Sequence, residues 1–191
     1  MRKAVLLVVA SLVFSIGIAG ATVPDATKCS VTPLDARQSM LTCPQYRGQV
    51  ATPLAGAAFT VNVRNGADEV IPNAFVEVVL PAIDIECPNI VASGNTDANG
   101  NITFNLAAGG CSIGTDVVSI IANTVPIRSY DECVSPDGDH SGAVSLGDFT
   151  AFGSDFQNNA AGCYDFDNSG GTTLGDFTLF GQAFGLSCTP Y

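Results

Sequence analysis

The sequence predicts a mainly β chain with a short α-helical end: an antiparallel β-sandwich followed by two loop–helix units. Three observations lead to this fold class. Short segments rich in β-branched residues alternate with turn residues in the first two thirds of the chain, a stretch near the C-terminus is repeated, and the composition changes between the two regions.

The first segment of the 191-residue chain is typical of an export signal. Arg2 and Lys3 give it a basic start, residues 4–18 form an apolar run, and residues 19–21 (AGA) are the small residues that a signal peptidase recognises. Because the run is too short to span a bilayer comfortably, we expect a cleaved signal peptide over 1–21 and no membrane span. The mature chain is then secreted, or held at the cell surface by contacts.

The charge of the chain excludes two classes of partner. The formal charge is −11, and removal of the two basic residues of the leader takes it to −13. A chain this acidic repels phosphate backbones and anionic lipid surfaces, so we expect neither a nucleic-acid partner nor binding to a membrane surface. It suits an extracellular protein that collects cations.

Residues 22–131 have the pattern of a β-sandwich domain. Strand-like runs separated by Gly, Pro, Asn and Asp occur at 57–65, 74–81, 101–109 and 116–125. The Asn-Gly pair in GNTDANGNITFNL (94–106) predicts a hairpin. Several short strands with few helix-period segments favour an antiparallel sandwich.

A second domain is expected over 132–191, after a connector at 126–136. Beyond Arg128 the chain has no Lys or Arg, and seven of its eleven phenylalanines follow residue 148. A simultaneous change of charge, aromatic content and periodicity is typical of a domain boundary.

The second domain contains an internal duplication. Residues 137–157 match residues 165–185 at twelve of twenty-one positions, with a constant offset of 28. Identities this dense, in one register, predict two equivalent loop–helix units.

Each copy has oxygen donors at the spacing of a twelve-residue calcium loop, with glycine at position 6. Calcium takes six to eight oxygens at about 2.3–2.6 Å, so alternate residues must point inward while the glycine allows a sharp turn. Three carboxylates per loop suit modest affinity, and His140 at position 4 is expected to point outward. The expected ligands of two Ca²⁺ ions, with position 7 acting through its carbonyl, are Asp137, Asp139, Ser141, Ala143, Ser145 and Asp148, and Asp165, Asp167, Ser169, Gly171, Thr173 and Asp176.

Phenylalanines mark one face of each helix that follows a loop. They recur at i, i+3 and i+7 as Phe149, Phe152 and Phe156, and as Phe177, Phe180 and Phe184. The simplest interpretation is a core shared by the two helices, and the alternative is an exposed stripe that binds a partner.

All seven cysteines follow the export segment, where an oxidising compartment favours disulfides. The sequence has no CxxC and a single histidine, so it contains no zinc motif. Proximity along the chain suggests the pairs Cys29–Cys43 and Cys87–Cys111, and the odd number means that at least one thiol is left over or pairs between molecules.

The loops DGDHSGAVSLGD and DFDNSGGTTLGD, each followed by a Phe-bearing helix, resemble the dockerin type I module over about residues 133–188. The resemblance implies a small calcium-dependent domain with pseudo-twofold symmetry that plugs into a cohesin domain on a scaffold or surface protein. It also implies neighbouring ends, and hence a pair of Cys188 with Cys133 or, alternatively, with Cys163.

The sequence departs from cohesin-binding dockerins at loop positions 10 and 11. Those proteins usually carry small hydroxyl residues there and basic residues later in the helix, whereas this chain has Leu146-Gly147, Leu174-Gly175 and no later Lys or Arg. The calcium ligands therefore carry over residue by residue, and the cohesin partner does not. The β-region, with PNAFVEV followed by TDANGNITF, resembles bacterial immunoglobulin-like and transthyretin-like modules, which implies a sandwich.

We therefore expect a secreted, non-enzymatic binding or anchoring protein that attaches to a cohesin-like or other surface protein through its calcium-loaded C-terminal domain. The alternative is a structural subunit of a surface layer or filament, in which edge strands and an odd cysteine would serve self-association. An enzyme is disfavoured because there is no usable histidine and no nucleophile elbow. The carboxylates of the β-region are also scattered, at Asp68, Glu69, Glu77, Asp84 and Glu86.

Overall fold

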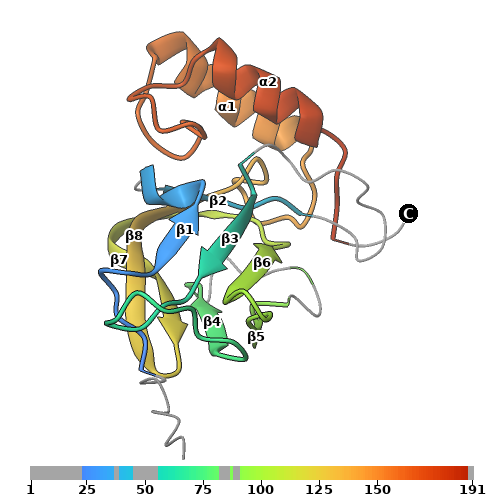
Figure 1. Cartoon of the computed structure of the whole chain (residues 1–191). Helices are drawn as coiled ribbons and strands as arrows, with labels where there is room; N and C mark the ends of the chain where they lie inside the picture. The colour runs from blue at the N-terminus through green and yellow to red at the C-terminus, as the bar shows by residue number, and fades with distance from the viewer. Residues whose placement is uncertain (1–22, 37–38, 45–55, 82–86, 88–90, 189–191) are drawn as a thin grey trace, which may run out of the picture.

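Figure 1 shows the chain as a computed structural model, in which two β-sheets lie below a pair of helices. The structure describes residues 23–36, 39–44, 56–81, 87 and 91–188, so the predicted signal peptide lies outside the described residues, as do Asp84 and Glu86. In chain order the elements are β1 (Ser30–Thr32), the 3₁₀ turn η1 (Leu34–Ala36), β2 (Ser39–Leu41), β3 (Ala58–Asn62), β4 (Phe75–Val79), β5 (Ser93–Asn95), β6 (Asn101–Asn105), β7 (Cys111–Ala122), β8 (Val125–Val134), α1 (Leu146–Asn158) and α2 (Leu174–Ala183).

The strands form two sheets around one core. One sheet has the order β1-β3-β6 and the other the order β2-β8-β7-β4-β5. Buried residues alternate with half-buried ones in β3 and with exposed ones in β4, as expected for sheets that bury one face. The core between them includes Val61, Val76, Phe104 and Ile120, with the rings of Phe59 and Phe104 5.6 Å apart.

The predicted fold class, an antiparallel immunoglobulin-like sandwich plus a small dockerin-like α module, is wrong. The five-stranded sheet is mixed because β2 pairs with β8 in parallel, and the sheets are curled (Figure 1). The two helices do not form a module with a core of its own, since their buried side chains pack against the β-region.

A second apolar cluster explains this difference. Phe152, Phe166 and Phe180 from the repeats pack with Leu41 and Val134 from β2 and β8. Two short helices with their loops cannot bury enough apolar surface alone, because the fraction of surface buried on folding falls steeply in small chains. The repeats complete their core by using the end of the β-region.

Two disulfides, Cys87–Cys188 and Cys111–Cys163, join the β-region to the repeats. The four pairings expected from the sequence are all wrong. Proximity along the chain suggested two of them and the resemblance implied the other two, whereas the bridges join the β-region to the repeats across 101 and 52 residues. The other three cysteines are buried and lie outside these bridges: Cys29, Cys43 and Cys133.

Two further expectations for the β-region are wrong, although strands do occur within all four predicted runs. The expected connector at 126–136 forms most of β8, which follows a two-residue turn at Asn123-Thr124 with φ angles of 44° and 70°. The predicted hairpin does not form, because its two strands pair in different sheets, β5 with β4 and β6 with β3.

Candidate metal sites

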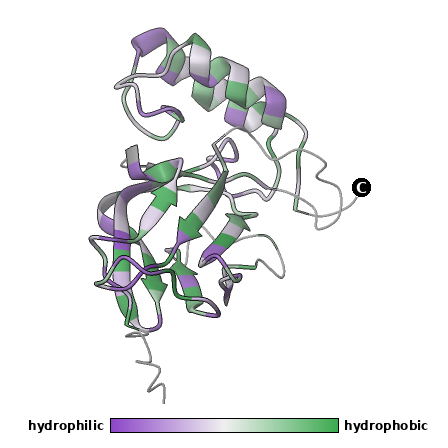
Figure 2. Ribbon diagram, viewed as in Figure 1, coloured by the Kyte–Doolittle hydropathy of each residue, from purple (hydrophilic) through white to green (hydrophobic). Residues whose placement is uncertain are grey.

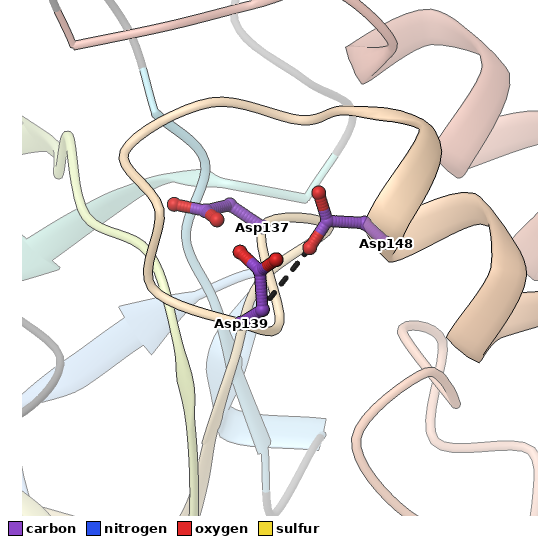
Figure 3. A group of neighbouring side chains, drawn as sticks. All are labelled: Asp137, Asp139 and Asp148. Atoms are coloured by element: carbon purple, nitrogen blue, oxygen red, sulfur yellow. Dashed lines mark hydrogen bonds between the residues drawn. The ribbon is translucent and has the colours of Figure 1, made fainter.

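The first acidic loop brings three carboxylates together. One oxygen from each of Asp137, Asp139 and Asp148 lies within 4.8 Å of the others, although Asp148 is in the first turn of α1. Figure 3 shows the three side chains converging inside the loop. Asp137 and Asp148 are fully buried, and Asp139 is exposed.

Main-chain N–H groups hold these carboxylates in place. The N–H groups of Ser141 and Gly142 donate to the two oxygens of Asp137 at 3.1 and 3.0 Å. The N–H of Asp139 donates to Asp148 at 3.3 Å, drawn as a dashed line in Figure 3. The loop needs left-handed backbone at two positions, His140 (φ 62°) and Gly142 (φ 79°), and glycine adopts that conformation without steric cost.

The second loop repeats this geometry. Oxygens of Asp165, Asp167 and Asp176 also lie within 4.8 Å of one another. Asp165 accepts the N–H groups of Ser169 and Gly170 at 2.9 and 2.8 Å, and Asp176 accepts the N–H of Asp167 at 3.2 Å.

The residues expected at position 9, Ser145 and Thr173, are helix N-caps. The Ser145 hydroxyl donates to Asp148 at 3.0 Å and accepts the N–H of Gly147 at 3.2 Å, and Thr173 makes the same two bonds in the second loop. Each position-12 aspartate closes a capping box by accepting the N–H of its own cap residue. These two hydroxyls therefore orient the carboxylates of Asp148 and Asp176.

The residues at positions 5 and 7 lie next to each other in both loops. The hydroxyl of Ser141 donates to the carbonyl of Ala143 at 3.1 Å, and Ser169 donates to the carbonyl of Gly171 at 3.3 Å. All twelve residues expected as ligands therefore belong to two compact, equivalent loops.

Two loop carboxylates differ in acidity: Asp165 at position 1 of the second loop and Asp139 at position 3 of the first. Burial raises the pKa of Asp165, the N–H groups of Ser169 and Gly170 oppose that shift, and the carboxylates of Asp176 and Asp167 add to it. Burial also acts to raise the pKa of Asp139, but hydrogen bonds from the hydroxyl and N–H of Ser141 outweigh it and hold that pKa below its ordinary value.

Each loop pairs with the chain that follows the opposite helix. In the first loop, the N–H of Val144 donates to the carbonyl of Leu186 and the N–H of Gly185 donates to the carbonyl of Val144, both at 2.9 Å. The N–H of Cys188 also donates to the carbonyl of Gly142 at 2.9 Å. In the second loop, Thr172 donates its N–H and its hydroxyl to the carbonyl of Ala160 at 2.8 and 2.9 Å. This reciprocal pairing unites the repeats into one unit.

Sequence reasoning missed the segment of the β-region that supports the first loop. The N–H of Gly110 donates to the carbonyl of Asp137 at 2.6 Å, and Ser135 connects the two segments by bonds to Ala108 and Asp137. A Cβ at Gly109 would lie 2.2 Å from Oδ2 of Asp137, so only glycine fits. The Gly109-Gly110 pair before β7 is the feature of the sequence that could have indicated this close contact.

The phenylalanines of the two helices are partly core, as the first interpretation expects, and partly an exposed stripe, as the alternative expects. Phe152 and Phe180 are buried, whereas Phe149, Phe156, Phe177 and Phe184 are 36–52% exposed. Figure 2 shows the apolar residues recurring along α1 and α2. Leu146 and Leu174, at loop position 10, are exposed by 69% and 72%. One side of each helix is core, and its neighbouring side is an apolar surface.

The two acidic triads could hold metal ions. Their donors are all oxygen, and three aspartates per loop form a hard ligand set that suits Ca²⁺ rather than a soft metal. The chemistry of the donor set therefore fits the ion expected from the sequence.

Comparison with known proteins adds little to this geometry. No protein-family model and no curated protein matches the chain. A chain from the crystal structure of a type II cohesin–X–dockerin complex of Acetivibrio cellulolyticus, a C-terminal interface mutant, aligns over 80% of this chain and 97% of its own length, with 17% identity and a TM-score of 0.28. Similarity this low carries no argument about fold or function.

Two observations bear on location. None of the helices formed by the described residues is long and apolar enough to cross a membrane. The two disulfides are consistent with an extracellular location, because disulfides persist in oxidising compartments.

Proposed function

We propose that the chain is a secreted, non-enzymatic binding or anchoring protein whose C-terminal repeats bind two Ca²⁺ ions and attach to a protein partner. The observation that carries the proposal is the apolar surface of α1 and α2. Six of the eleven exposed large apolar side chains among the described residues lie on these helices or at their ends. Large exposed apolar patches are typical of protein-binding surfaces.

The calcium ions have a structural part in this proposal. Position 12 of each loop is the third residue of a helix, so an ion held by Asp148 or Asp176 fixes the start of that helix against its own loop. Ion binding thus orders the surface on which the partner docks, and no catalytic step is involved.

Thermal unfolding of the secreted chain, with Ca²⁺ or with EDTA, tests the metal. At one hundred times the dissociation constant, each ion adds about 2.7 kcal/mol of stability, or roughly 5–10 °C for a chain of this size. Titration calorimetry should give two ions per chain, and Asp139→Ala with Asp167→Ala should abolish the response. A melting temperature that is the same in Ca²⁺ and EDTA would contradict the proposal.

Capture of partners from the envelope or secreted fraction tests the attachment. Retention in Ca²⁺, release in EDTA and loss in the double aspartate variant are expected. If the protein instead forms large assemblies in size-exclusion chromatography, and these dissociate in reductant, the role is that of a structural subunit.

A further inference from the structure

Two equivalent grooves open on the apolar surface between α1 and α2. The first has a volume of about 280 Å³, and the second about 310 Å³. Phe149 and Phe177 line both grooves, and Gly153 in the first corresponds by the 28-residue offset to Gly181 in the second. We call these two cavities the paired grooves.

The glycines of the paired grooves are not required by the fold. Gly153 and Gly181 lie inside α1 and α2, and a Cβ added at either position would meet no atom of the described residues within 4 Å. Neither has a positive φ. Glycine in a helix interior costs stability relative to alanine, so both repeats have an unfavourable residue at a position where no contact among residues 23–36, 39–44, 56–81, 87 and 91–188 requires it.

The size of each groove suits a side chain rather than a cofactor. Small-molecule sites usually have volumes of about 300–1,000 Å³, and both grooves are at or below the lower end of this range. Phe156 and Leu174 close the first groove, and Phe184 and Leu146 close the second. An aliphatic side chain inserted into either groove would be surrounded by aromatic rings.

Charge selects the kind of partner. From residue 129 onward the chain has nine carboxylates and no Lys or Arg, and two Ca²⁺ ions would neutralise only four of these charges. A second copy of the chain would bring the same negative charge to the contact. A surface that combines aliphatic side chains with Lys or Arg complements both the apolar lining of the paired grooves and the negative charge of the repeats.

We propose that Gly153 and Gly181 keep the paired grooves open for two aliphatic side chains of a protein partner whose docking surface is basic. This inference rests on the proposed binding function and specifies the contact. The partner's aliphatic side chains supply the affinity by burial, and its basic residues increase the association rate and exclude acidic competitors.

A synthetic amphipathic helix with leucines on one face and lysines on the other is a suitable probe. Since the protein has no tryptophan, one Trp in the peptide reports binding by fluorescence. In Ca²⁺ we expect saturable binding of this peptide that weakens as salt is added. Two control peptides, one with Glu in place of Lys and one with Ser in place of Leu, should bind at least about tenfold more weakly. A loss of about tenfold corresponds to losing part of the burial of one side chain.

The variant Gly153→Leu with Gly181→Leu fills both grooves from the protein side and should weaken peptide binding by at least about tenfold. Ser154→Leu with Gln182→Leu is the matched control, because it adds the same side chains at exposed positions outside the grooves. Calcium-dependent melting confirms that each variant is folded, so a failure of the grooves is distinguishable from a failure of the metal sites.

Four outcomes would overturn the inference: no binding of the lysine peptide, equal binding of the glutamate peptide, unchanged binding by the groove-filling variant, or equal loss in the control variant. Sedimentation of the protein alone adds a fifth. A calcium-dependent dimer that the groove-filling variant abolishes would identify a second copy as the occupant, and it would contradict the basic partner.

Discussion

The two acidic loops are identical at seven of twelve positions, yet they are attached to the rest of the molecule in different ways. The first loop rests on main chain of the β-region, with the Asp137 carboxylate against Gly109. The second is tied by the Cys111–Cys163 bridge, two residues before Asp165, and by the end of α1. The first loop thus packs against main chain of the β-region at Gly109, whereas the second is connected to the β-region through a disulfide two residues before it begins.

Position 2 of the loops shows what this difference requires of the sequence. It is Gly138 in the first loop, where a Cβ would lie 2.5 Å from the hydroxyl oxygen of Tyr164. It is Phe166 in the second loop, where the ring is buried in the cluster shared with β2 and β8. The residue at position 2 therefore differs between the repeats according to what it packs against, whereas the three aspartates and the serine at position 5 are the same in both copies.

The largest expected effect follows from removing the covalent attachment of the second loop. Cys111→Ser with Cys163→Ser opens a 52-residue span and should lower the free energy of unfolding by about 4 kcal/mol, because the unfolded chain gains conformational entropy. Chemical denaturation measures the change, and calorimetry should show that the second calcium site weakens more than the first. Equal weakening of both sites would mean that the attachments do not act separately.

A matched pair of glycine substitutions tests the packing of the first loop. Gly109→Ala forces the Asp137 carboxylate out of its position, and we expect a loss of about 1–3 kcal/mol with weaker calcium binding at the first site. At Gly171 the three atoms nearest to an added Cβ all belong to the side chain of the exposed Asn159, which can turn away, so the cost of Gly171→Ala should be within about 0.5 kcal/mol. Thermal melting and calcium titration of both variants give the comparison, and a larger effect at Gly171 would reverse it.

The helix caps should respond equally, since both loops have the same capping box. Without calcium, Ser145→Ala and Thr173→Ala should each lower stability by about 1 kcal/mol, because each removes a bond to a helix N–H. The controls Thr150→Ala and Thr178→Ala, at exposed helix positions, should change it by less than about 0.5 kcal/mol. If denaturant unfolding gives different stability losses for the two cap variants, the different surroundings of the two loops also affect the caps.

Acid titration without calcium should produce the smallest effects and should separate Asp165 from Asp139. The raised pKa of Asp165, due mainly to burial, means that its ionised form is disfavoured in the folded state, so its contribution to stability improves as pH falls through that pKa. Burial acts to raise the pKa of Asp139 too, but bonds from Ser141 lower it, so its stabilisation is present above its unfolded pKa and is lost as pH falls through the folded one.

Carboxyl carbon NMR should therefore show Asp165 protonating at a higher pH than Asp139. Near neutral pH, Asp165→Asn should stabilise the calcium-free protein relative to Asp139→Asn, which loses a favourable charge interaction. The opposite order of titration would show that the surroundings of the two loops do not set their acidity in this way.

The sequence alone determined the local chemistry of this protein. The spacing of Asp137, Asp139 and Asp148, and the same spacing in the second copy, places three carboxylates around one point because a twelve-residue loop with glycine at position 6 turns alternate residues inward. The predicted strands in the β-region also depend on a local signal, the alternation of apolar residues.

Only the tertiary structure decided how these parts are joined. The parallel pairing of β2 with β8, the disulfides across 52 and 101 residues and the contact of Gly109 with Asp137 all join segments that are far apart in the chain. No periodicity or spacing encodes such contacts, because they depend on which apolar surfaces remain uncovered after the local elements form. The helical repeats could not bury Phe152 and Phe180 alone, so the end of the β-region became part of their core.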